Sequence, residues 1–457
     1  MAEKPPAASV AEHLAASIAV LDTGKLPQAL REKCVELLID VGGLCVTARN
    51  EDYIKSALAG CDDDGSCTAI GHARGFSAAS ASFINGTAAH GEDFDDTFEG
   101  GPVHAGAVIV PAVLAACERH RPDGPAALLG IAVGTEVMCR LSTVVPKAVH
   151  KAGFHPTAIF GVMGAAAGVG ASLGLNARQI VDALGIAASF AGGIIEYLAE
   201  GAWTKRLHPG WAAQSGIRAA LLARGGFLGP RTVFEGVHGL FHGFAHTTKG
   251  DYAALVDGFG RNWVTETLAF KPYPCGTMAH PYIDCAKRLA ARGIKAGNIK
   301  EMVCEVAEGT VHRLWEPLAD KQRPPNGYAA KFATPFILAT GFVRGGVGLE
   351  AFTERAVRDK DVLAVASKVR YVIDPDNPYP NNFTGHIRAV LNDGSVVEER
   401  QPHFRGGAKE PLTRADIEEK FTLNVRHGGW DDKRASSALK QLAKLYEGKI
   451  DLAFLRG

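Results

Sequence analysis

The sequence has no excess of charge of either sign, because 49 Lys and Arg residues balance 49 Asp and Glu residues over 457 positions. A chain without a net positive field has no long-range attraction to nucleic acid, and a chain without a polybasic tail has none to anionic lipid. We therefore expect neither nucleic acid nor a membrane among the partners of this protein.

Paired cysteines are also lacking. The nine cysteines form no C-x-x-C pair and stand at positions 34, 45, 61, 67, 117, 139, 275, 285 and 304. An odd number at irregular spacing favours free thiols in a reduced compartment over a disulfide framework. Residues 1–16 carry charges and prolines instead of an uninterrupted apolar stretch, so we expect no secretory signal and a cytoplasmic location.

Two motifs that would define a function are missing. The nucleophile motif G-x-S-x-G does not occur, and the glycines of residues 168–174 miss the dinucleotide-binding spacing by one residue and follow no expected strand. Residues 156–176 are uncharged and long enough to cross a bilayer. They are rich in Gly and Ala, however, and no Trp/Tyr belt flanks them. We expect this segment to be a buried helix of the core.

Helical periodicity dominates the chain up to about Leu268 and returns near the C-terminus. Residues 28–40, for example, alternate charged and apolar positions with a period near that of the α-helix. The intervening part alternates polar and apolar residues as strands do. We predict a mainly α fold with an α+β part. A large helical domain is formed by residues 1–268 and 406–457, and a smaller α+β domain, residues 269–405, is inserted between them.

Individual elements follow from the same patterns. In the large domain we expect helices at residues 103–120, 126–141, 177–190, 413–421 and 434–447, and Asn176 is a typical N-cap for the third of them. In the inserted domain we expect strands at 298–306, 369–374, 387–391 and 396–399 and helices at 281–292 and 329–341. The sequence Asn392-Asp393-Gly394 predicts a tight turn that joins the last two strands.

The most unusual segment is the acidic run G-E-D-F-D-D-T-F-E-G-G-P-V-H-A-G of residues 91–106. In it, Asp93, Asp95 and Asp96 precede His104 across a glycine-rich loop. A carboxylate beside a histidine fixes the imidazole tautomer and raises its basicity, as proton transfer requires. Carboxylate oxygens also bind hard cations. The segment therefore predicts either a general base or a metal site.

Three further segments place chemically active residues at the junctions of expected elements. They contain His155, then Lys205, Arg206 and His208, and then Lys271 and Cys275. Because Lys and Arg donate charge-assisted hydrogen bonds to carboxylates, the second segment suits a small polyanion. Each segment also has a purely structural interpretation, as a helix cap, a solvated loop and a linker respectively.

Taken together, four segments resemble the MmgE/PrpD family over nearly the whole chain. They are D-F-D-D-T at residues 93–97 with the following His104, G-F-H-P-T at 153–157, K-R-L-H-P-G at 205–210 and K-P-Y-P-C at 271–275. The family includes 2-methylcitrate dehydratase, cis-aconitate decarboxylase and iminodisuccinate epimerase. The resemblance implies a helical domain, a lid-like α+β domain, a cleft between them and a homodimer. It also implies chemistry on small di- or tricarboxylates without a metal or other cofactor.

With the residues singled out above, the resemblance defines a set of candidate site residues. The candidate catalytic residues are Asp93, His104, His155 and Lys271, and the candidate substrate-binding residues are Thr97, Lys205, Arg206, His208, Cys275 and His280. The match departs from the family in places. Dehydratases tend to have Asn where this chain has Asp95, whereas the spacing to His104 is nearer to that of fungal cis-aconitate decarboxylases. Mammalian decarboxylases place a His where this chain has Cys275-Gly276.

The chemistry that the family shares is proton transfer next to a carboxylate. Removing such a proton leaves extra negative charge, which Lys205 and Lys271 could stabilise without a metal. His104 or His155 could take the proton, with Asp93 orienting the imidazole. A second acid then decides between dehydration, decarboxylation and epimerisation. We predict a metal-free lyase, with an epimerase as the alternative. A metal-dependent hydrolase that uses the acidic run and a non-catalytic scaffold are further alternatives.

Overall fold

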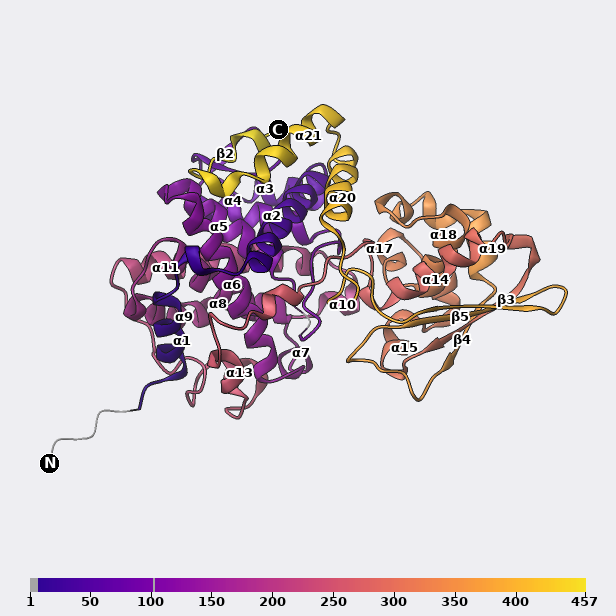
Figure 1. The fold of residues 1–457 in the computed structure, drawn as a ribbon, viewed down its shortest axis with the longest axis horizontal. Coiled ribbons are helices and arrows are strands. Elements are labelled where there is room, and N and C mark those ends of the chain that lie inside the picture. Colours follow the sequence, from indigo (N-terminus) through magenta and orange to yellow (C-terminus); the bar gives the residue numbers. More distant parts are fainter. Residues whose placement is uncertain (1–6, 102) are drawn as a thin grey trace. The chain divides into compact units, whose positions relative to one another are not determined.

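Figure 1 shows a computed structural model of the chain, which describes residues 7–101 and 103–457. Residues 1–6, part of the segment in which we expect no secretory signal, and Pro102 of the acidic run lie outside the described residues. The chain divides into two compact units. The helical unit comprises the chain up to Gly91, Asp95–Leu268 and Thr413–Gly457, and the α+β unit comprises Glu92–Phe94 and Ala269–Leu412. The predicted fold class, mainly α with a smaller α+β part, is confirmed.

Helices provide nearly all the regular structure described in the helical unit. In chain order they are α1 (Val10–Ala19), α2 (Gln28–Ala48), α3 (Asp52–Ala59), α4 (Ala78–His90), α5 (Gly106–His120), α6 (Gly124–Val144), α7 (Ala148–Lys151), α8 (Pro156–Ser172), α9 (Ala177–Phe190), α10 (Tyr197–Glu200), α11 (Thr204–Arg224), α12 (Leu240–Ala245), α13 (Tyr252–Val256), α20 (Arg414–His427) and α21 (Asp432–Leu442). Strands β1 (Cys67–Thr68) and β2 (Gly75–Phe76) form a short antiparallel pair. Helices α5, α6 and α9 confirm three of the predicted helices.

Helix α8 belongs to the core of the helical unit and is buried along nearly its whole length. Glycines allow it to approach α6 closely. A Cβ on Gly168 would lie 2.5 Å from the carbonyl oxygen of Gly130, and one on Gly164 would lie 2.7 Å from that of Gly134. These distances are too short for packed atoms. Glycine at these two positions therefore allows α8 to pack closely against α6. Among the described residues, one helix, α6, is long and apolar enough to cross a bilayer, and its apolar window is 89% buried.

Cap residues explain where two helices of this unit begin. Asn176 accepts a hydrogen bond from the N–H of Gln179 at the start of α9, as predicted, and Thr413 caps α20 in the same way. Helix α20 packs on α2, where Nζ of Lys420 lies 2.7 Å from Oδ1 of Asp40. Both side chains are buried. The C-terminal helices therefore share a core with the N-terminal ones.

The α+β unit is built on a four-stranded sheet. The strand order is β4 (Val369–Ile373), β3 (Ile299–Val306), β5 (Gly385–Leu391) and β6 (Val396–Gln401). Strands β3 and β4 are parallel and the other neighbours antiparallel, with β5 and β6 forming the predicted hairpin. The helices are α14 (His280–Ala291), α15 (Glu308–Leu314), α16 (Leu318–Gln322), α17 (Gly327–Ala330), α18 (Thr334–Arg344) and α19 (Lys360–Ala366). Helix α14 packs on β5, β6 and α18, and it helps to enclose a core around Met302, Ile387 and Trp315.

Two boundaries in this unit differ from those expected. The helix expected at residues 329–341 is divided into α17 and α18, because Pro335 occupies the first turn of α18 and has no N–H to continue a preceding helix. The domain boundary expected after residue 405 lies after Leu412. The carbonyl of Gly406 accepts a hydrogen bond from the N–H of Phe270 at 3.0 Å, which holds this stretch in the α+β unit.

Candidate active site

Four histidines from separate segments of the helical unit lie close together. His90 is the last residue of α4, His104 precedes α5, His155 is the N-cap of α8 and His208 lies in α11. The ring centroids are 4.8 Å apart for His90–His104, 5.7 Å for His90–His155 and 5.3 Å for His155–His208. We refer to these four residues as the histidine cluster. Three of them were predicted as site residues, and His90 was missed.

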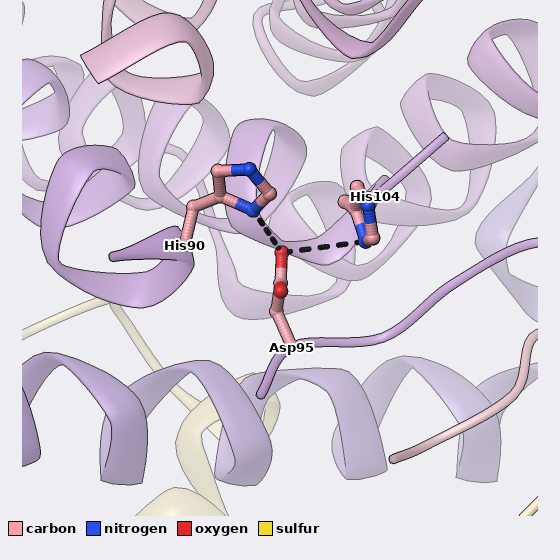
Figure 2. A group of neighbouring side chains, drawn as sticks. All are labelled: His90, Asp95 and His104. Carbon is pink, nitrogen blue, oxygen red and sulfur yellow. Dashed lines mark hydrogen bonds and ion pairs between the residues drawn. The ribbon is translucent and has the colours of Figure 1, made fainter. Parts of the chain in front are cut away.

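A single carboxylate oxygen faces two members of the histidine cluster (Figure 2). Oδ2 of Asp95 lies 2.7 Å from Nδ1 of His90 and 3.7 Å from Nδ1 of His104. The side chains of His90 and Asp95 have no exposed surface, whereas that of His104 is 14% exposed. The shorter distance is that of a charge-assisted hydrogen bond, and the longer one is a close electrostatic contact.

Asp96 orients His104 through its main chain and its side chain. The carbonyl oxygen of Asp96 lies 2.7 Å from Nδ1 of His104. A carbonyl can only accept a hydrogen bond, so this Nδ1 carries the proton, and the neutral ring has its basic lone pair on Nε2. The Asp96 carboxylate accepts the N–H groups of Ala105 and Gly106 at the start of α5. These bonds hold in place the loop that carries His104.

The carboxyl group of Asp96 also gives the stability of the fold a distinctive pH dependence. Burial and the nearby charge of Asp95 raise its pKa from 3.8 to about 7. The folded chain therefore binds this proton more tightly than the unfolded chain. The contribution of Asp96 to the free energy of unfolding is full below a pH of about 4 and is lost as the pH rises toward 7.

We expect the difference in free energy of unfolding between wild type and Asp96→Asn, which does not titrate, to fall by roughly 2 kcal/mol from pH 5 to pH 7. Urea unfolding of both proteins at the two pH values measures this difference. Other titrating groups are shared by the two proteins and cancel. A difference that stays constant with pH would contradict the raised pKa of Asp96.

His155 and His208 form a second pair within the cluster, with their Nδ1 atoms 3.1 Å apart. Burial, followed by the nearby His90 and His208 rings, holds the pKa of His155 well below its usual value. Burial, together with His90 and Lys205, lowers the pKa of His208 to about 4. Both rings are therefore neutral near neutral pH, with one Nδ1 donating to the other. Tyr197 packs edge-on against both rings.

Two cationic side chains begin α11, and they have different surroundings. Lys205 is partly buried, and its charge lowers the pKa of both rings of the second histidine pair. The guanidinium carbon of Arg206 lies 4.3 Å from the ring centroid of Tyr53, and this cation–π contact restrains the side chain. Thr97 is buried in the acidic loop. The helical unit therefore places a cation suited to a carboxylate near the neutral imidazoles of His155 and His208.

The remaining candidate residues belong to the α+β unit. Lys271 is buried, and its Nζ donates to the carbonyl oxygen of Asp93 at 2.9 Å. Lys331, which was not predicted, is also buried and donates to the carbonyl and to the carboxylate of Glu92 at 2.8 and 2.9 Å. These bonds attach residues 92–94 to the α+β unit, although the sequence placed them within the helical domain.

Two other aspartates contact His104 within the helical unit, and the orienting role expected of Asp93 stays a prediction. Asp95 and Asp96 both contact His104, and Asp93 belongs to the α+β unit. The three aspartates stand within four positions of one another, so spacing in the sequence could not separate them. Asp93 and Lys271 stay predictions as catalytic residues.

Cys275 and His280 are packed inside the α+β unit. Burial raises the pKa of the Cys275 thiol to about 12, so the thiol stays protonated and is a poor nucleophile. Nε2 of His280 lies 3.2 Å from the carbonyl oxygen of Cys275, and its ring packs edge-on against Tyr273 and Phe404. Packing accounts for both residues, and their roles in substrate binding stay predictions.

Among the described residues, His90, Asp95 and His104 are the ones placed to hold a metal ion, because their ligand atoms all lie within 4.8 Å of one another. The hydrogen bonds favour a proton network instead. The His90–Asp95 distance of 2.7 Å is that of a hydrogen bond, and Nδ1 of His104 is bonded to the Asp96 carbonyl. The ligand set considered from the acidic run also changes. The Asp96 carboxylate accepts N–H groups of α5.

Two family models match this chain. The MmgE/PrpD N-terminal domain matches residues 12–253, and the MmgE/PrpD C-terminal domain matches residues 273–444. The two matches together cover well over half of the chain. The gap between them contains Leu268, where the helical unit passes into the α+β unit.

Three relatives resemble the chain over most of its length at modest identity. Human cis-aconitate decarboxylase is 30% identical over 403 residues, which are 82% of this chain and 79% of that protein. The cis-aconitate decarboxylase-like protein oryM of Aspergillus oryzae is 26% identical over 443 residues, or 92% and 91% of the two chains. Cis-aconitate decarboxylase of Aspergillus terreus is 27% identical over 434 residues, or 88% and 86%.

Proposed function

This chain belongs to the MmgE/PrpD family, and on that premise we propose that it is a metal-free lyase acting on a small tricarboxylate. The human and Aspergillus terreus relatives are cis-aconitate decarboxylases. They support a lyase of the decarboxylase or dehydratase type, and they lend no support to the epimerase alternative. Decarboxylation of a cis-aconitate-like substrate is our first choice, and dehydration of a hydroxy-tricarboxylate is the second.

The observation that carries this proposal is the orientation of His104. Its Nδ1 is bonded to the Asp96 carbonyl, which leaves Nε2 as the basic nitrogen of the neutral ring. His104 is also the most exposed member of the histidine cluster, because the other three are each at least 95% buried. A substrate can therefore reach this ring, and the ring can transfer a proton at a defined atom.

Proton transfer at carbon fits both lyase outcomes. In a dehydration, Nε2 of neutral His104 takes the proton next to a carboxylate, the C–H electron pair forms the new double bond, and the hydroxyl leaves as water after protonation. In a decarboxylation, the bond to the leaving carboxylate breaks, its electron pair stays on carbon as CO2 departs, and a protonated imidazole supplies the proton. In either case the Lys205 ammonium would stabilise negative charge on a retained carboxylate.

Incubation with cis-aconitate in D2O, followed by NMR and a CO2 assay, tests the proposal. Decarboxylation should release CO2 and give an unsaturated dicarboxylate that has gained deuterium on carbon. A panel of hydroxy-tricarboxylates run in parallel should show dehydration as alkene formation without CO2. A product of unchanged formula with deuterium at an inverted centre would replace the lyase with an epimerase. Turnover in which no carbon–hydrogen bond is made or broken would overturn the proposal.

We expect activity to survive the removal of metals. The protein's own cations can stabilise developing negative charge, and the His90–Asp95 contact has the distance of a hydrogen bond. Turnover should be unchanged after dialysis against a strong chelator, and elemental analysis of the active protein should show no stoichiometric divalent metal. Loss of turnover that a divalent ion restores would favour the metal-dependent alternative at His90, Asp95 and His104.

We also propose that the chain forms a homodimer through its helical unit. Ile194, Leu198, Trp203 and Trp211 are 60, 56, 50 and 46% exposed, and large apolar side chains that are exposed on one face mark an interface. Light scattering at micromolar concentration should give about twice the 48.2 kDa chain mass. Trp211→Lys should shift the protein toward monomer, whereas Val396→Lys at an exposed site of β6 should not. A monomeric wild type would contradict the proposal.

A further inference from the structure

We propose that His90 and Asp95 form a positioning pair that stabilises the protonated form of His104 during proton transfer. The inference rests on the proposed function, because it concerns the residue that exchanges a proton with the substrate. Neither His90 nor Asp95 has to touch the substrate, since both act through the His104 ring. His90 lies outside the residues by which the family was recognised, so its pairing with Asp95 comes from the structure.

Asp95 stands beside both His90 and His104. Its Oδ2 lies between two imidazole nitrogens, 2.7 Å from Nδ1 of His90 and 3.7 Å from Nδ1 of His104 (Figure 2). Nδ1 of His104 already donates to the Asp96 carbonyl at 2.7 Å. Asp95 therefore acts on His104 as a nearby charge, while its hydrogen bond to His90 fixes where that charge stands.

The two neighbouring aspartates thus have different tasks. Asp96 orients His104, since its carbonyl determines the tautomer and its carboxylate binds the N–H groups that begin α5. None of these hydrogen bonds includes an atom of the Asp95 carboxylate. The contribution that we infer for Asp95 is electrostatic, because its carboxylate oxygen stands 3.7 Å from the ring that becomes charged. Removing the charge of Asp95 should therefore alter the basicity of His104 more than its orientation.

Asp95 is placed to stabilise the positive charge that forms on His104. When Nε2 of His104 takes a proton, a cation forms in a largely buried place, where an anion 3.7 Å away interacts more strongly than it would in water. The titratable groups recorded around His104 and Asp96 include His90 on α4, Asp95 in the same loop, Asp40 on α2, Cys139 on α6, His155 at the start of α8, and Lys205 and His208 on α11. The histidines and the lysine, when charged, disfavour a further cation. The carboxylates favour it, and the carboxylate of Asp95 contacts the His104 ring.

Three variants separate charge from shape. Asp95→Asn removes the charge and keeps the size of the side chain. His90→Asn places an amide N–H where Nδ1 of the ring stands, so the hydrogen bond to Asp95 is kept, whereas His90→Leu removes it. Circular dichroism and thermal unfolding establish that each variant is folded before it is assayed.

The kinetic readout is the pH profile of turnover. We expect Asp95→Asn to lower kcat by at least ~10-fold and to lower the pKa assigned to His104 in the profile by about one unit, with KM changed less than about threefold. His90→Leu should resemble Asp95→Asn, and His90→Asn should stay within about threefold of wild type. A merely structural role would change stability or KM without moving this pKa.

A second readout does not need a substrate. NMR of histidine labelled with ¹³C at Cε1, with His104→Gln to assign the signal, measures the pKa of His104 directly. It should fall by about one unit in Asp95→Asn and in His90→Leu and stay near wild type in His90→Asn. An unchanged His104 pKa in folded Asp95→Asn overturns the positioning pair. If that variant does not fold, equal His104 pKa values in His90→Leu and His90→Asn overturn it.

The two proposals fail in different ways. A shifted His104 pKa in a wild-type protein that turns over no tricarboxylate would support the His90–Asp95 pair and overturn the proposed function. Turnover that is normal in wild type and in every variant, with no shift in the pKa of His104, would overturn the pair and leave the lyase assignment intact.

Discussion

His104→Ala should lower kcat for the proposed tricarboxylate substrate by at least ~10²-fold, because positioned acid–base groups contribute on this scale or more. The fold should be intact. The N–H groups that begin α5 donate to the Asp96 carboxylate and not to the imidazole. The His104 ring is also the partly exposed member of the histidine cluster. Steady-state kinetics together with circular dichroism measure both effects.

The matched control is His238→Ala, which removes an exposed histidine of the same unit and should leave kcat unchanged. His155→Ala distinguishes the two candidate bases. If His104→Ala is nearly as active as wild type and His155→Ala is inactive, His155 is the group that transfers the proton. If both retain activity, the histidine cluster is not the catalytic site.

Lys271→Met should lower kcat by a similar factor of at least ~10², since electrostatic stabilisation of a developing anion is worth this much. The resemblance to the family places this lysine in the catalytic set, and methionine keeps an unbranched apolar stem while removing the charge. Because Nζ of Lys271 also holds the carbonyl of Asp93, stability has to be measured with activity. Kinetics and urea unfolding on the same preparation provide both values.

Cys275→Ala provides the contrast within the same segment. Its thiol is fully buried and stays protonated, so the loss of kcat should be much smaller than for Lys271→Met. If Lys271→Met loses stability but keeps kcat when folded, Lys271 has the structural role of anchoring residues 92–94 and no part in the chemistry. Near wild-type kinetics and stability together would remove it from both roles.

Much of the fold could be predicted from the sequence, because helices and hairpins are specified by neighbouring residues. The capping side chain of Asn176 and the periodicity of residues 177–190 together define α9, and the turn at residues 392–394 defines the β5–β6 hairpin. The family was identified from four short segments, and the matches of both family domains confirm it. The division at Pro335 was missed, although the rule that a proline begins a helix was available.

The sequence by itself determined the fold class, the family and three members of the histidine cluster, since each depends on residue type and local spacing. Only the tertiary structure showed that Asp95 and Asp96 contact His104, because Asp93, Asp95 and Asp96 carry the same local signal in the sequence. It also added His90, a lone histidine at the end of α4 that no local pattern marks. Contacts between residues far apart in the chain depend on packing. These contacts determine which nitrogen of the His104 ring carries the proton and which carboxylate stands beside it.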